Sequence, residues 1–112
     1  MRYLCNKYWG NVGNWYPVND NVKRAKIDEY LDFHHTNTRK CSFYIFNSLF
    51  AKNLGIPTDP QFVQAEAKKN VDKALKDISK YYLANNNFIT GENPTLADLS
   101  AYYEIQFLML VG

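Results

Sequence analysis

The side chains best suited to chemistry lie in the segment 34–47, HHTNTRKCSFYIFN. Arg39 is the polar residue of most interest, because a guanidinium can hold an anionic group through parallel hydrogen bonds. Phe43 follows one helical turn later, where it would supply an aromatic wall beside the cation. An exposed arginine that pairs only with solvent or a carboxylate explains the same pattern equally well. The segment therefore predicts either an anion-binding site or an ordinary charged surface.

Metal and nucleophile chemistry have weaker support. His34 and His35 are adjacent, and adjacent positions lie about 100° apart around a helix, so they cannot hold one metal ion together. We interpret His34 as a core or hydrogen-bonded histidine. Cys5 and Cys41 are too few to make a metal site, and we expect both to be reduced packing residues. The sequence thus predicts no metal, no cofactor and no catalytic residue within this chain.

A long helix over about 20–53, with or without a bend, is expected to position the segment 34–47. One stripe of this helix carries the residues expected in the core: Ile27, Leu31, His34, Thr38, Cys41, Ile45 and Leu49. The opposite stripe carries Thr36, Arg39, Phe43, Asn47 and Phe50. No charge occurs over 41–51, so this part of the helix must be covered on both sides. Either a ligand cleft or another protein surface should lie against the second stripe.

Two further helices, over about 59–84 and 95–111, complete an all-α chain. The first has a regular apolar stripe and a lysine-rich face that we expect to be solvated. The second begins with Thr95 and Asp98, whose spacing predicts a capping box and a buried helix N-terminus. We interpret Asp98 as a structural cap, and not as a general acid or base. A short helix at 1–9 and a linker at 10–19 precede the three helices.

Composition excludes several classes of protein. The chain has 112 residues, enough for one domain, and its net charge of +2 comes from 13 basic and 11 acidic residues. No basic run is dense enough to follow a phosphate backbone, so nucleic acid is not an expected partner. The longest apolar stretch, within 41–51, contains polar residues and is too short to span a bilayer. A cytoplasmic protein without a membrane partner is the default expectation.

Two separated segments carry a resemblance to a known family. The segment FITGENPTLADLSAYYEIQ resembles the sixth-helix region of glutathione S-transferases, and WYPVNDNVKRAKIDEYLDFHHTNTRK resembles the fourth helix of the theta class. The resemblance covers nearly the whole chain and implies a truncated form of the family's C-terminal helical bundle. Residues 1–9 would be a remnant of the thioredoxin-like domain's last helix. Residues 10–19 would be the interdomain linker, and 20–112 the helical C-terminal domain.

The resemblance also implies an activity, the conjugation of glutathione to electrophiles in detoxification, with glutathione as a cosubstrate. In the family the thioredoxin-like domain holds glutathione and, in theta enzymes, supplies a catalytic serine. That domain has no counterpart here, so the chain would be inactive alone. It would form one wall of the electrophile site and part of a homodimer interface.

The family's site positions carry over to the fourth-helix segment of this chain. The resemblance implies substrate contacts at Thr36, Arg39, Phe43 and Asn47, and it places Thr36, Asn37, Thr38 and Arg39 near glutathione. Asn47 departs from the aromatic residue of some members, so the preference of the electrophile pocket stays open. Two other hypotheses also stay open: a helical protein interaction module related to the family, and a decayed member without activity.

Overall fold

The computed structural model describes residues 1–8, 13 and 15–111, and it is all-helical in them, without a named strand. Residue 9 of the predicted helix at 1–9, and residues 10–12 and 14 of the predicted linker at 10–19, lie outside the described residues. The helices are α1 (Arg2–Tyr8), α2 (Asn21–Thr36), α3 (Lys40–Ile45), α4 (Pro60–Phe62), α5 (Lys68–Asp77) and α6 (Leu96–Gln106). Wider π turns follow α3, α4 and α5 (Phe46–Phe50, Val63–Ala67 and Ile78–Tyr82), and a 3-10 turn (Phe107–Leu110) follows α6.

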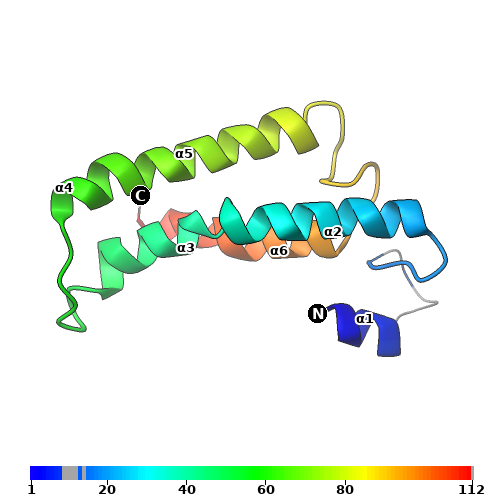
Figure 1. The fold of residues 1–112 in the computed structure, drawn as a ribbon, viewed down its shortest axis with the longest axis horizontal. Coiled ribbons are helices and arrows are strands. Elements are labelled where there is room, and N and C mark those ends of the chain that lie inside the picture. Colours follow the sequence, from blue (N-terminus) through cyan, green and yellow to red (C-terminus); the bar gives the residue numbers. More distant parts are fainter. Residues whose placement is uncertain (9–12, 14, 112) are drawn as a thin grey trace.

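Figure 1 shows α2 and α3 nearly in line, with the α4 to α5 rod running back alongside them. Helix α6 lies behind α2 and α3 in this view, and α6 contacts both of them. The described residues extend over 48 × 30 × 20 Å. No helix in this part of the chain is long and apolar enough to cross a membrane.

The long helix predicted over 20–53 is interrupted. Helix α2 ends at Thr36, a turn occupies 37–39, and α3 begins at Lys40. The Asn37 side chain donates to Phe33 O (3.2 Å) and Thr36 Oγ1 (2.9 Å), and Asn and Thr side chains of this kind compete with the regular helix hydrogen bonds. The backbone N–H of Arg39 bonds five residues back, to His34 O at 2.9 Å. The turn ends α2 and places Arg39 at the junction with α3.

The predicted core stripe is confirmed at five of its seven residues despite the interruption, and the other two, Leu31 and Leu49, are half-buried. Ile27, Thr38 and Cys41 are fully buried, and His34 and Ile45 are nearly so. Two clusters make the core, one between α2 and α6 around Tyr30 and Leu96, and one between α3 and the α4 to α5 rod. Both cysteines are buried and free, as expected. The helical rod predicted over 59–84 is also present, and Asp59 caps it by accepting the N–H of Gln61 at 2.9 Å.

The capping box predicted at the start of α6 is present, and this helix end is buried. The Thr95 N–H donates to Asp98 Oδ2 at 2.8 Å. Asp98 Oδ1 accepts a further hydrogen bond from the Ile89 N–H at 2.7 Å, and the Leu96 N–H donates to Trp15 O at 2.9 Å. Groups from distant segments thus complete the hydrogen bonds of this helix N-terminus, and they fix α6 against the rest of the core.

Candidate functional site

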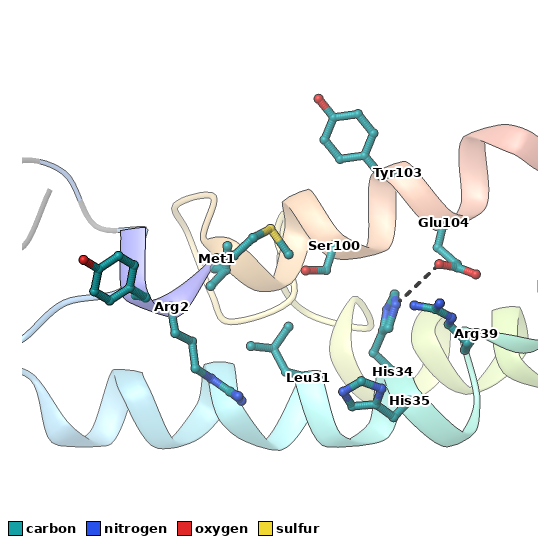
Figure 2. A pocket seen from close by; sticks show the side chains of 11 residues that line it. Met1, Arg2, Leu31, His34, His35, Arg39, Ser100, Tyr103 and Glu104 are labelled. Carbon is teal, nitrogen blue, oxygen red and sulfur yellow. Dashed lines mark ion pairs between the residues drawn. The ribbon is translucent and has the colours of Figure 1, made fainter. Parts of the chain in front are cut away.

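A pocket of about 450 Å³ lies between α2, α6 and the first residues of the chain. Its polar lining comes from α1 (Arg2, which pairs with Asp28), from the end of α2 and the following turn (His34, His35, Arg39) and from α6 (Ser100, Glu104). Figure 2 shows Ser100 and Glu104 pointing from α6 toward α2, while His34 points from α2 toward Glu104. Met1, Leu31 and Leu96 are among its apolar walls. The volume falls in the range of small-molecule sites.

A buried network of His34, Glu104 and Ser42 lies at the pocket's inner end. His34 Nε2 is 3.6 Å from Glu104 Oε2, and the two side chains are 10% and 11% exposed. Glu104 Oε1 accepts the backbone N–H of Ser42 at 3.2 Å and also the Ser42 hydroxyl. One carboxylate therefore ties α2, α3 and α6 together. The sequence signal for it was slight: Glu104 is the only charged residue after Asp98.

The environment of His34 favours a neutral imidazole. Burial lowers the pKa of His34 below its ordinary value, the charges of His35 and Arg39 lower it further, and Glu104 opposes the shift. Because Nε2 faces the carboxylate, we assign the proton to Nε2. Nδ1 then carries a lone pair, and it is buried without a hydrogen-bond partner in the described part of the chain. The expectation of a core histidine is confirmed, and one of its ring nitrogens, Nδ1, has no hydrogen-bond partner among the described residues.

Arg39 is an exposed cation at the rim of this pocket. In Figure 2 its guanidinium lies beside the His34 ring. Within residues 1–8, 13 and 15–111, its side chain makes no ion pair and no hydrogen bond. The guanidinium therefore keeps its donors for solvent or for a ligand.

The remaining positions that were predicted to lie near glutathione differ in burial. Thr36 is exposed and Asn37 is half-buried, and both lie next to the turn that carries Arg39. Thr38 is fully buried, and its hydroxyl shares a 3.3 Å hydrogen bond with the Tyr30 hydroxyl. A ligand contact at Thr38 does not fit this placement, because its side chain belongs to the core.

The structure does not bring Phe43 and Asn47 into the pocket with Arg39. Phe43 is 53% exposed and packs edge-on against Phe62, with ring centroids 6.4 Å apart. The Asn47 side chain donates to Phe43 O at 2.7 Å. Phe43 follows Arg39 by one helical turn, and its N–H lies 3.4 Å from Arg39 O. Phe43 does not line this pocket, so its role as an aromatic wall beside Arg39 stays a prediction. The aromatic side chains that line the pocket are Tyr3 and Tyr103.

No group of three or more His, Cys, Asp and Glu side chains in the described ranges could hold a metal ion. The site offers a cation, a neutral imidazole and a hydroxyl, which suit binding and orientation of a ligand.

Comparisons with known proteins agree on one family. No family model matches the chain. Glutathione S-transferase T1 of Arabidopsis thaliana is 38% identical over 112 residues, which cover 97% of this chain and 45% of that protein. Glutathione S-transferase theta-1 of Homo sapiens is 37% identical, over 94% of this chain and 43% of that protein.

Solved structures give the same result. Human glutathione S-transferase T1-1 in its apo form superposes with a TM-score of 0.82 and 33% identity, over 98% of this chain and 46% of that one. Human glutathione transferase theta-2, in complex with glutathione and an unknown ligand, superposes with a TM-score of 0.86 and 27% identity, over 98% and 44%.

The chain spans less than half the length of the curated relatives that it matches. Within that span, the sequence alignments and the structural superpositions cover nearly every residue of the chain. Over nearly its whole length the chain is homologous to theta-class glutathione S-transferases, and it has the all-helical architecture of the matching part of their structures.

Proposed function

We propose that this chain serves in a theta-like glutathione S-transferase, where it forms one wall of the site for an anionic electrophile. Arg39 holds the anionic group. One observation carries the proposal: among the described residues the Arg39 guanidinium has no ion-pair partner, and it stands at the rim of a pocket of about 450 Å³ in a chain whose relatives are theta-class transferases. Glutathione is the cosubstrate, and no residue of this chain takes a catalytic role.

The described residues contribute orientation. A guanidinium forms directed, charge-assisted hydrogen bonds with a carboxylate or a sulfate, so Arg39 would fix one end of the electrophile. Glu104 supports Arg39 indirectly, because it holds His34, whose carbonyl accepts the Arg39 N–H at 2.9 Å. Thr36 and Asn37 flank the same turn, and they would lie next to glutathione.

A chimera tests this function in an assembled enzyme. The matching segment of the Arabidopsis T1 relative is replaced by this chain, and conjugation is assayed with an anionic and a neutral electrophile. Arg39→Ala should lower kcat/KM for the anionic electrophile about tenfold, the loss of roughly one charge-assisted hydrogen bond, and leave the neutral one nearly unchanged. Lys40→Ala, which removes the neighbouring cation, is the matched control.

Two outcomes would contradict the proposal. One is a chimera that folds and binds glutathione but conjugates neither electrophile. The other is an Arg39→Ala variant that loses both activities equally. The chain by itself should show no saturable glutathione binding in calorimetry, and millimolar or tighter binding would contradict its role as one wall of a larger site.

We also propose that the assembled protein is a cytoplasmic homodimer. The exposed edge-on pair of Phe43 and Phe62, 53% and 45% exposed, supports an apolar contact with a second copy. Sedimentation should show self-association that Phe43→Asp weakens. A sharply monomeric and folded chain would contradict the dimer.

A further inference from the structure

Two residues that line the pocket each carry a buried polar atom without a partner among the described residues: His34 Nδ1 and Ser100 Oγ. Each residue is 8% exposed, and both line the pocket that Arg39 borders. Buried side-chain polar atoms in folded proteins almost always have a hydrogen-bond partner, and leaving one unpaired is costly. A pair of such atoms in one pocket therefore indicates a group that binds there.

The polarity of this pair can be assigned. With the His34 proton on Nε2 toward Glu104, 3.6 Å away, Nδ1 can only accept a hydrogen bond. The Ser100 hydroxyl can donate and accept, and it hangs from α6 on the side that faces α2 (Figure 2). The matching ligand group carries its own donor, such as a hydroxyl or an amide N–H.

The other residues that line the pocket indicate the charge of a complementary ligand and the polarity of its remaining surface. Of the charged lining residues, Arg2 pairs with Asp28 and Glu104 pairs with His34, whereas Arg39 makes no ion pair among the described residues. Leu31 and Leu96 supply apolar walls. An apolar or aromatic body with one anionic group would satisfy these surfaces, because each would meet its complement.

We propose that His34 and Ser100 form a polar subsite that selects, among small organic anions, those with a hydroxyl or N–H donor on an apolar body. Hydroxylated aromatic acids are the simplest members of this class. The inference deepens the proposed function, on which it rests only for the role of Arg39 as the group that holds the anion.

Matched acids test the subsite on the chain as it stands. Nitrogen-15 spectra of backbone and imidazole groups are recorded while benzoate, 3-hydroxybenzoate or 4-hydroxybenzoate is added. At least one hydroxybenzoate should bind about fivefold more tightly than benzoate, the effect of one net hydrogen bond, and it should shift the His34 Nδ1 resonance. Equal affinity for all three acids would overturn the subsite, because the two atoms would then be served by water alone. Absence of binding by all three would overturn it as well.

Variants separate the subsite from Arg39. Ser100→Ala removes an unpaired hydroxyl without altering the fold, so it should reduce the hydroxyl preference to about twofold and leave benzoate affinity unchanged. Tyr102→Phe, which removes an exposed hydroxyl on the same helix from a residue that does not line the pocket, is the control and should leave the preference intact. A Ser100→Ala variant with the full preference would overturn the role of Ser100.

The same titrations distinguish failure of the proposed function from failure of the subsite. Arg39→Ala should weaken all three acids to a similar degree and keep the preference. If Arg39→Ala leaves benzoate affinity unchanged while the preference persists, Arg39 does not hold the anion and the subsite stands. If it weakens every acid and no preference exists, Arg39 stands and the subsite is wrong.

Discussion

The start of α6 and the pocket face that follows it on the same helix differ in how completely their polar groups are paired. At the start, the Asp98 carboxylate accepts from the N–H groups of Thr95 and Ile89 at 2.8 and 2.7 Å, and from the Thr95 hydroxyl at 3.1 Å. About a turn later, the Ser100 hydroxyl is buried without a partner in the described residues, and His34 Nδ1 across the pocket is in the same state. The saturated region stabilises the fold, whereas the unsaturated region keeps hydrogen-bonding capacity for a ligand.

Removing the central group of the saturated region should have the largest effect. Asp98→Ala would leave the buried N–H groups of Thr95 and Ile89 without a partner, so it should lower the free energy of unfolding by about 3 kcal/mol. Urea unfolding measures the change. Glu92→Ala, which removes an exposed carboxylate from the preceding turn, should stay within about 0.5 kcal/mol. Equal losses in the two variants would show that the cap contributes little.

The Glu104 network lies further along α6, at the pocket, and should give an intermediate effect. Glu104→Ala removes the acceptor of the Ser42 N–H and the partner of His34, so stability should fall by about 2 kcal/mol. Glu104→Gln keeps the shape and one acceptor oxygen, and it should lose about half as much. Thermal unfolding compares the two, and a Gln variant that is less stable than the Ala variant would contradict the assigned hydrogen bonds.

The Tyr30 to Thr38 hydrogen bond in the core should contribute less. Thr38→Val and Tyr30→Phe each remove one hydroxyl of a buried pair, and each should cost about 1 kcal/mol. Because the two hydroxyls serve each other, the double variant should cost little more than either single change. Additive losses in this double-mutant cycle would mean that the hydroxyls have other partners. A loss of ligand affinity in the Thr38→Val variant would show that Thr38 contributes to ligand binding after all.

The smallest expected effect is the dependence of stability on pH through His34. Its pKa is lowered in the folded protein, so the unfolded chain binds the proton more readily. The contribution is therefore fully present above the ordinary histidine pKa of about 6.5 and is lost as pH falls from there through the lower folded value. Glu104, His35 and Arg39 are the charged or titratable groups facing it. In the His34→Gln variant, the free energy of unfolding measured with urea should change less between about pH 7 and pH 5 than in the unaltered chain. An unchanged dependence on pH would contradict a proton-free Nδ1.

Periodicity and capping chemistry predicted the scaffold well. The core stripe of α2 and α3 and the box of Thr95 and Asp98 depend on residues within one or two turns of each other, so the sequence displays them directly. A bend in this helix was left open, but its place at 37–39 was not predicted, because helical periodicity does not show that the Asn37 side chain competes for the Phe33 carbonyl.

The candidate site was predicted in part. Arg39 was identified by type and position, and the pocket around it was not. Ser42 and Glu104 are 62 positions apart, and only the packing of α3 against α6 brings them together. Ser100 gave no signal of its own, because a serine on an apolar helix is common and its missing partner is visible only in three dimensions.

Urea unfolding of Asp98→Ala beside Arg39→Ala tests the contrast between the two regions most directly. The Arg39 side chain makes no ion pair and no hydrogen bond within the described ranges, so its variant should stay within about 0.5 kcal/mol of the unaltered chain. Asp98→Ala should lie at least about 2 kcal/mol below it. Equal losses, or a larger loss with Arg39→Ala, would contradict the division between a saturated cap that stabilises the fold and an unpaired cation held for a ligand.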